Sequence, residues 1–407
     1  MKCGLLGRKL GHSYSPQIHA LLGNYSYQLF EKEPEEIGDF LKNGDFTGLN
    51  VTIPYKKEVI PFLDELSPAA ARLGAVNTIV RRDGKLIGHN TDYFGFRRLV
   101  QESGLQVAGK KVLVLGSGGA SSTAVAVLQE LGAKVTVISR SGENNYENLD
   151  RHADAAVIAN TTPVGMYPNT GKSALSLEGF PQLEGVLDAV YNPARTQILL
   201  DAERRGLAAV NGLWMLVAQA KESAEWFTGE EIPDSRIAKI HHTLRLQMEN
   251  IILIGMPGCG KTAVGQQLAQ KLGKKFVDAD ESLEARVCRK ITDIIPNDGE
   301  AAFREMESET LAELGKQSGL VIATGGGCVT QPQNYPLLHQ NGTIFWLKRE
   351  LDKLPTDGRP LSQKGTLGQM YEARMPLYLR FADAAISNDG SIAETASAIC
   401  RKLEETT

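Results

Sequence analysis

Residues 250–262 read NIILIGMPGCGKT, an apolar run that leads into a glycine-rich turn ending in Gly-Lys-Thr. The apolar run predicts a buried strand, and the residues after Thr262 have the apolar spacing of a helix. A glycine loop in this position directs backbone N–H groups and a helix N-terminus at a phosphate, and its lysine reaches the β- and γ-phosphates. The segment therefore predicts an α/β nucleotide-binding domain. Its candidate nucleotide-binding residues are Gly258, Cys259, Gly260, Lys261 and Thr262.

A second strand, glycine loop and helix begin upstream, at residues 111–120, KVLVLGSGGA. Another strand pattern follows at 134–138, which completes a βαβ unit of the length that binds dinucleotides. It ends in Ser139 and Arg140, where an enzyme that uses NAD usually has an acidic residue against the ribose 2'-hydroxyl. Arginine suits a 2'-phosphate, so we expect NADP(H), although an arginine that only caps the strand at the surface is the alternative. The candidate cofactor residues are Gly116, Gly118, Gly119, Ala120, Ser139 and Arg140.

Length and composition indicate several domains that act on small molecules. A chain of 407 residues is too long for one hydrophobic core. The net charge of -4, without a long basic run, argues against a nucleic-acid partner. The five scattered cysteines favour reduced thiols, and no stretch reaches the ~18 apolar residues of a membrane span or has the pattern of a signal peptide. We therefore expect a cytoplasmic location, and the sequence leaves open a monomer or a homodimer.

The two glycine-loop units divide the chain. We expect an α/β domain at 1–105, a Rossmann domain at 106–212 and a helical region at 213–242. A linker at 243–249 would then lead to a nucleotide-binding domain at 250–407. The expected fold class is α/β throughout: an N-terminal α/β domain with a Rossmann domain, followed by a P-loop NTPase-type domain.

Five short motifs follow the phosphate loop in order. They are FVDAD at 276–280, FREME at 303–307, ATGGG at 323–327, GRPL at 358–361 and RMPLY at 374–378. Together with the loop, this series resembles shikimate kinase along nearly all of 248–407. The resemblance implies ATP as phosphoryl donor, Mg²⁺, and shikimate as acceptor.

The same resemblance implies a role for each polar residue of these motifs. Arg304 and Arg374 would hold the shikimate carboxylate, although singly each could be an ordinary surface arginine, Arg304 as a partner of Glu307. Asp280 would bind the ring hydroxyls and is the candidate to take the proton of the attacking one. The other implied residues are Gly326 and Gly327 in the site wall, Thr262 and Asp278 for Mg²⁺, partly through water, and Arg359 in a closing lid. The lid stretch is short, and a second lid arginine is absent unless Arg349 serves.

Seven motifs lie before the kinase part. They are GHSYSP at 11–16, NVTIPYKK at 50–57, GAVNT at 74–78, GHNTD at 88–92, NTTPVGM at 160–166, DAVYNP at 188–193 and MLVAQA at 215–220. This series resembles shikimate dehydrogenase over about 1–242. The resemblance implies NADPH-dependent reduction of 3-dehydroshikimate to shikimate. It also implies that residues 1–105, completed by the helical region at 213–242, form the substrate-binding and catalytic domain.

Lys56 and Asp92 would form the proton-transferring pair, and the sequence leaves open which of them is the proximate donor. By resemblance, Ser13 and Ser15 would bind the substrate carboxylate. The residues expected around the ring are Thr52, Asn77, Tyr191 and Gln219, and Met166 is expected at the cofactor. We interpret His89 as a hydrogen-bonded structural residue rather than a general base.

The combined hypothesis is a bifunctional enzyme that makes shikimate and then phosphorylates it. The alternative is a quinate or shikimate dehydrogenase in which one half acts only as a ligand-sensing or scaffolding module. The presence of Lys56, Asp92, Lys261 and Asp280 favours catalysis in both halves.

Overall fold

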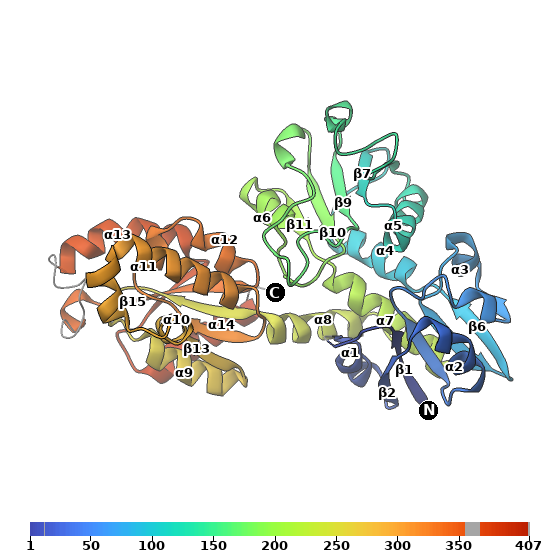
Figure 1. Ribbon diagram of the computed structural model, residues 1–407, viewed down its shortest axis with the longest axis horizontal. Helices are drawn as coiled ribbons and strands as arrows, with labels where there is room; N and C mark the ends of the chain where they lie inside the picture. Colours follow the sequence, from blue (N-terminus) through green and yellow to red (C-terminus); the bar gives the residue numbers. More distant parts are fainter. Residues whose placement is uncertain (12, 355–366, 406–407) are drawn as a thin grey trace. The chain divides into compact units, whose positions relative to one another are not determined.

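The computed structural model describes residues 1–11, 13–354 and 367–405, and it divides into two compact units. The first unit contains Met1–Val164, Ser173–Tyr191 and Ile198–Thr243. The second contains Leu244–Thr407 together with the short segments Gly165–Lys172 and Asn192–Gln197. Figure 1 shows the elements of both units along the chain.

The first unit begins with a six-stranded mixed sheet in the order β2-β1-β3-β5-β6-β4. Its strands are β1 (Lys2–Gly7), β2 (Ser26–Glu31), β3 (Gly48–Val51), β4 (Glu65–Leu66), β5 (Thr78–Arg82) and β6 (Lys85–His89). Its helices are α1 (Ser15–Leu22), α2 (Ile37–Asn43), α3 (Pro68–Leu73) and α4 (Asp92–Glu102), with 3₁₀ turns at Pro34–Glu36 and Ile60–Phe62. Every residue of β3 is buried, because this strand lies inside the sheet between β1 and β5.

The second sheet of this unit is parallel throughout and has the order β11-β10-β9-β7-β8. Its strands are β7 (Lys111–Leu115), β8 (Lys134–Ile138), β9 (Val157–Asn160), β10 (Gly185–Asp188) and β11 (Ala208–Val210). The helices are α5 (Gly119–Glu130) and α6 (Gln197–Arg204), with 3₁₀ turns at Leu149–His152 and Leu177–Gly179. The order reverses at β7, which is where α/β sheets bind ligands beyond the carboxyl ends of their strands.

Helix α7 (Leu213–Thr228) returns to the N-terminal sheet, where it packs against α4 and contacts β3 and β5. It ends at Gly229, whose φ of +73° is the left-handed conformation that glycine adopts without strain. Helix α8 (Ser235–Met248) follows, and β12 begins at Asn250. The residues 243–249, expected as a linker, are therefore mostly the last turns of a helix.

The second unit is built on a parallel five-stranded sheet in the order β13-β14-β12-β15-β16. The strands are β12 (Asn250–Ile254), β13 (Lys275–Asp278), β14 (Leu320–Ala323), β15 (Gly342–Lys348) and β16 (Ala384–Ser387). The helices are α9 (Lys261–Leu272), α10 (Ala279–Val287), α11 (Ile291–Gly315), α12 (Asn334–His339), α13 (Leu367–Phe381) and α14 (Ile392–Glu405), with 3₁₀ turns at Cys328–Thr330 and Leu351–Lys353. β12 is central and wholly buried, so the loop after it is held by the middle of the sheet.

In the part of the chain that the structure describes, none of the helices combines the length and apolar composition needed to cross a bilayer.

Candidate active sites

Lys56 and Asp92 meet in the first unit, as the sequence predicts. Lys56 lies in the turn after β3, and Asp92 is the first residue of α4, where the helix dipole favours a negative charge. The Lys56 Nζ atom lies 2.5 Å from Asp92 Oδ2. The Lys56 side chain is 27% exposed and that of Asp92 only 8%, so the ammonium is the more accessible member of the pair.

Asn77 and Gln219 also come together. The Asn77 amide donates to Gln219 Oε1 at 3.0 Å and to Thr91 Oγ1 at 3.0 Å. Its Oδ1 accepts, at 2.7 Å, the backbone N–H of Thr91, which is the residue directly before Asp92. Gly95 of α4 permits this arrangement, because an added Cβ there would lie 2.6 Å from Met215 O and 3.0 Å from Gln219 Cβ.

The expected carboxylate-binding residues lie around the start of α1. Ser13 Oγ accepts the backbone N–H of Ser15 at 3.2 Å. The Tyr14 ring contacts the Tyr191 ring edge-on, with centroids 6.1 Å apart. Burial raises the pKa of the Tyr191 phenol, so this hydroxyl stays protonated and can donate. Thr52 is half-buried immediately after β3.

The predicted dinucleotide loop connects β7 to α5. Gly116 has a φ of +109°, and an added Cβ would meet Thr161 Oγ1 at 3.0 Å. Cβ atoms added at Gly118 and Gly119 would meet nothing within 4 Å, so these glycines border open space at the start of α5, as a dinucleotide requires. Ala120 lies in the first turn of α5.

Arg140 is exposed at the carboxyl end of β8, next to half-buried Ser139. Burial raises the pKa of Tyr146, and the positive charge of Arg140 opposes this rise. An exposed guanidinium at this end of the sheet fits the 2'-phosphate of NADP. Met166 is exposed and belongs to the segments grouped with the second unit, so its role stays a prediction.

His89 differs from its interpretation as a hydrogen-bonded residue. Neither ring nitrogen has a hydrogen-bond partner within the described parts of the chain. The ring instead stacks on Trp226, with centroids 3.6 Å apart. Burial, assisted by Arg82, lowers the pKa of His89 to about 4, so the ring is neutral and packs as an aromatic group.

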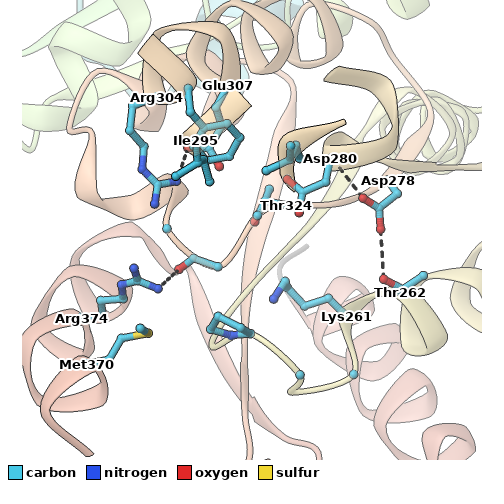
Figure 2. Close-up of a pocket in the computed structure, with 18 of the residues that line it drawn as sticks. Lys261, Thr262, Asp278, Asp280, Ile295, Arg304, Glu307, Thr324, Met370 and Arg374 are labelled. Carbon is cyan, nitrogen blue, oxygen red and sulfur yellow. Dashed lines mark hydrogen bonds and ion pairs between the residues drawn. The ribbon is translucent and has the colours of Figure 1, made fainter. Parts of the chain in front are cut away.

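In the second unit the predicted residues surround one cavity of about 430 Å³. Figure 2 shows Arg304 and Arg374 on one side of it and Lys261, Thr262 and Asp278 on the other. The predicted residues that line the cavity are Gly258, Gly260, Lys261, Thr262, Asp278, Asp280, Arg304, Gly326, Gly327 and Arg374. Cys259 is fully buried within the same loop, and Arg359 lies outside the described residues.

The phosphate loop wraps around its own lysine. Lys261 Nζ donates to the carbonyl oxygens of Gly255 at 2.9 Å and Met256 at 3.1 Å. The loop adopts this shape because Gly255, Gly258 and Gly260 have φ values of +146°, +82° and +97°. These carbonyls hold the ammonium inside the loop, where it can turn toward a phosphate.

Thr262 and Asp278 form an oxygen pair that fits Mg²⁺. The Thr262 hydroxyl donates to Asp278 Oδ2 at 3.0 Å. The other carboxylate oxygen of Asp278 accepts the backbone N–H of Asp280 at 3.0 Å and so caps α10. Hydroxyl and carboxylate oxygens are the donors that Mg²⁺ prefers next to nucleotide phosphates, and the fixed carboxylate keeps them in place.

Asp280 carries a carboxyl group whose pKa is raised to about 6. Burial is the largest cause, and the negative charges of Glu307 and Asp278 add to it, against the opposing charges of Lys261 and Arg304. Gly325 makes room for this acidic group, since an added Cβ would lie 2.5 Å from Glu307 Oε1 and 2.9 Å from Asp280 Oδ1. A carboxyl with such a pKa is suited to take a proton near neutral pH.

Arg304 is not the surface residue that its sequence context allows. It is 6% exposed and donates through Nη1 to Glu307 Oε2 at 2.8 Å. Arg304 Nε and Glu307 Oε1 are buried and have no partner in the described residues. Buried polar atoms without partners are costly, so these two atoms are available for hydrogen bonds to a bound ligand.

Tyr378 and Asn388 were not predicted as site residues. Tyr378 is buried, and its hydroxyl donates to the Gly326 carbonyl at 2.6 Å, next to the 3.3 Å hydrogen bond from Arg374 Nη1. Asn388 Nδ2 donates to the Cys259 carbonyl at 2.6 Å and so holds the phosphate loop. Tyr378 lies in a quoted motif, whereas Asn388 follows β16 without any local signal.

Arg349 reaches the phosphate loop. A Cβ added at Gly260 would lie 3.8 Å from Arg349 Nη1. Its Nε is buried and, among the described residues, has no hydrogen-bond partner. The structure thus places a cation beside the loop, and its use as a second lid arginine stays a prediction.

Comparisons with known proteins identify the families of both parts of the chain. The family model for the shikimate dehydrogenase substrate-binding domain matches residues 5–79, and the one for shikimate kinase matches residues 257–404. A shikimate dehydrogenase (NADP(+)) of Clostridium perfringens is 37% identical over 264 residues, which cover 60% of this chain and 97% of the relative.

Solved structures give the same result for the first part. Shikimate dehydrogenase 1 of Peptoclostridium difficile is 38% identical with a TM-score of 0.56, over 60% of this chain and 98% of the other. A chorismate mutase/shikimate 5-dehydrogenase fusion protein of Clostridium acetobutylicum is 36% identical with a TM-score of 0.57, over 60% and 96%. The comparisons confirm the predicted fold class. The chain belongs to the shikimate dehydrogenase family and carries a shikimate kinase domain in its C-terminal part, which makes it a bifunctional enzyme of the shikimate pathway.

Proposed function

We propose that the first unit reduces 3-dehydroshikimate to shikimate with NADPH, and that the second unit transfers the γ-phosphoryl group of ATP to that shikimate. The observation that carries the proposal is that each unit brings its predicted reactive groups together: the Lys56–Asp92 pair in one unit and the cavity around Lys261, Asp280 and two arginines in the other.

In the first unit, Lys56 gives a proton to the carbonyl oxygen that is reduced. Its greater exposure relative to Asp92 supports this choice of donor. Asp92 binds the ammonium and fixes its direction. The loop from Gly116 to Ala120 would hold NADPH, with Arg140 at its 2'-phosphate, and NADPH would supply the hydride. Ser13, Ser15, Thr52, Asn77, Tyr191 and Gln219 would bind the substrate carboxylate and hydroxyls.

In the second unit, Arg304 and Arg374 hold the shikimate carboxylate, and Asp280 takes the proton of the attacking hydroxyl. The raised pKa of Asp280 supports the second role. Lys261 neutralises charge on the phosphates. Thr262 and Asp278 would hold Mg²⁺, which would supply further neutralisation. The closing role of Arg359 rests on family resemblance.

The proposed setting is the cytoplasm, which the five free cysteines support. A monomer and a homodimer both fit the proposal, and neither nucleic acid nor membrane has a part in it.

A substrate comparison on the full chain tests the proposal. Shikimate with NADP⁺ should give NADPH, and shikimate with ATP and Mg²⁺ should give ADP and shikimate 3-phosphate by mass spectrometry. Quinate with NAD⁺ should react at least tenfold more slowly in kcat/KM. Faster turnover of quinate and NAD⁺, or a half that turns over no substrate, would favour the dehydrogenase with a sensing or scaffolding module instead.

A further inference from the structure

A buried group of hydroxyl and amide side chains lies behind the Lys56–Asp92 pair. Its members are Asn50, Asn77, Thr78, Thr91 and Ser223, each between 0% and 8% exposed. Buried polar groups are costly unless they are hydrogen-bonded, so a cluster of five has to be satisfied internally. The family resemblance gave no role to Ser223.

Helix α7 packs on strand β3, and residues at similar spacings along the two elements contact each other in this cluster. Gln219, Ser223 and Phe227 lie four residues apart on α7, about 6 Å of rise for each step. Gly48 and Asn50 lie two residues apart on β3, about 6.6 Å. Phe227 packs on Gly48, where an added Cβ would lie 2.3 Å from its ring, and Ser223 bonds Asn50. The next helical step places Gln219 beside the substrate-binding face.

The Ser223 hydroxyl is the centre of the cluster. It accepts from Asn50 Nδ2 at 2.8 Å and donates to the Gln219 carbonyl at 2.9 Å. It also lies 2.8 Å from Thr78 Oγ1 and 3.0 Å from Thr91 Oγ1. One oxygen thus links strands β3 and β5, the residue before α4, and helix α7.

The direction of the bonds that lead to Gln219 is set by the Asn77 amide. Its Oδ1 accepts the backbone N–H of Thr91 at 2.7 Å, so both protons of the amide lie on the Nδ2 side. The Thr91 oxygen then accepts from Asn77 Nδ2. The second Asn77 proton goes to Gln219 Oε1. This contact turns Oε1 toward Asn77 and so directs the Gln219 amide nitrogen, which is a donor, away from Asn77.

We propose that Ser223 is a positioning residue of the dehydrogenase site, which through Thr91 and Asn77 makes Gln219 present a hydrogen-bond donor to an oxygen of the substrate. The inference rests on the proposed function of the first unit. It adds a residue remote from the substrate and a stated polarity for Gln219. The same bonds anchor Thr91, which precedes Asp92, so loss of Ser223 also loosens the proton-transferring pair.

The test compares two alanine substitutions on the same helix. Thr228 Oγ1 donates to the Ala224 carbonyl at 2.9 Å, the same bond to the preceding turn that Ser223 makes to Gln219, but it lies outside the cluster. Ser223→Ala should lower kcat/KM for shikimate oxidation by about 5-fold to 100-fold, the range for a buried partner left unsatisfied. Thr228→Ala should change it less than twofold. In both variants KM for NADP⁺ and the kinase rate should stay within twofold of wild type.

A second variant tests the polarity directly. Gln219→Glu keeps the shape and the acceptor for Asn77 but replaces the free donor by an acceptor. It should lose at least as much kcat/KM for shikimate as Ser223→Ala. Thr78→Val removes another bond to Ser223 while keeping shape, and its combination with Ser223→Ala should lose less than the product of the single effects.

Several results would overturn the inference. They are equal kcat/KM values in Ser223→Ala and Thr228→Ala, a loss that affects shikimate and NADP⁺ alike, multiplicative effects with Thr78→Val, or full activity in Gln219→Glu. If Ser223→Ala fails to fold, Gln219→Glu and Thr78→Val still decide. Failure of the proposed function would appear differently, as wild-type protein that does not oxidise shikimate.

Discussion

Lys56 Nζ and Asp92 Oδ2 lie 2.5 Å apart although the two residues are 36 positions apart in the chain. Two hydrogen bonds from backbone N–H groups explain why the two side chains lie so close. The backbone N–H of Val76 donates to the Lys56 carbonyl at 2.7 Å, and that of Thr91 donates to Asn77 Oδ1 at 2.7 Å. The segment before β5 therefore holds both members of the pair in place.

Removal of the Lys56 ammonium should stop one activity of the chain and leave the other. Lys56→Met keeps the length of the side chain but cannot give a proton, so kcat for 3-dehydroshikimate reduction should fall by about 10²- to 10⁴-fold. The kinase rate of the same preparation should stay within twofold. Lys57→Met is the control, because Lys57 is exposed and adjacent. Equal losses of kcat in both variants would contradict a role of Lys56 in proton transfer.

Arg140 should set the preference for NADP over NAD. Arg140→Ala deletes the exposed cation at the end of β8 and should raise KM for NADP⁺ by about 10-fold to 100-fold, the cost of one charged contact. KM for NAD⁺ should change less than threefold. Arg204→Ala, an exposed arginine of α6, is the matched control. An unchanged ratio of the KM values for NADP⁺ and NAD⁺ would show that Arg140 only caps the end of the strand.

Asp280 should give the kinase an acidic limit. Its pKa of about 6 means that the carboxylate is present above pH 6 and protonated below it. If this carboxylate takes the proton of the acceptor hydroxyl, kcat/KM for shikimate should fall about tenfold per pH unit below that value. The pH profile of phosphorylation checks this, and a profile that stays flat from pH 7 to 5 would contradict it.

The Asp280 carboxyl should also lower the stability of the second unit near neutral pH. An ordinary aspartate ionises near pH 3.8, and Asp280 near 6 in the folded unit. The folded state binds more protons between these values, so stability falls as the pH rises through this range and stays low above it. Asp280→Asn should therefore stabilise the second unit by up to about 3 kcal/mol near pH 7.5, and by less near pH 5, while phosphorylation is lost. Thermal unfolding at both pH values measures the difference, and a variant less stable than wild type at pH 7.5 would contradict the expectation.

Arg374 should bind shikimate without carrying much stability. It is half-buried on α13 and bonds the Gly326 carbonyl at 3.3 Å. Arg374→Leu should raise KM for shikimate by about 10-fold to 100-fold, with KM for ATP within twofold. Arg380→Leu replaces an exposed arginine of the same helix and should leave both values unchanged. A rise in KM for ATP alone would show that Arg374 binds the nucleotide rather than shikimate.

The sequence predicts the parts of the fold that depend on local pattern. Strands β7 and β12 and their glycine loops follow from apolar runs and turn chemistry, which act between near neighbours. The Ser223 cluster could not be predicted, because Ser223 and Asn50 are 173 positions apart and meet only through the packing of α7 on β3. His89 was misread for a similar reason, since its partner is the ring of Trp226 on that helix.

The kinase site shows the same division. The order of its motifs predicts which residues line the cavity. It does not predict that Arg304 is buried against Glu307, because an i, i+3 spacing is equally typical of a surface pair. A linker at 243–249 was expected because a new strand and glycine loop begin at β12. The structure instead continues helix α8 through these residues, because Leu244 and Met248 keep one face of the helix buried.

The most direct test of two consecutive reactions on one chain is a mixed assay with 3-dehydroshikimate, NADPH, ATP and Mg²⁺. NADPH absorbance and ADP release are followed together on the purified full-length protein. ADP release should begin after a lag, depend on NADPH, and approach one equivalent per NADPH consumed. NADPH consumption without ADP, even after shikimate is added, would contradict the kinase half, and ADP release only from added shikimate would contradict the dehydrogenase half.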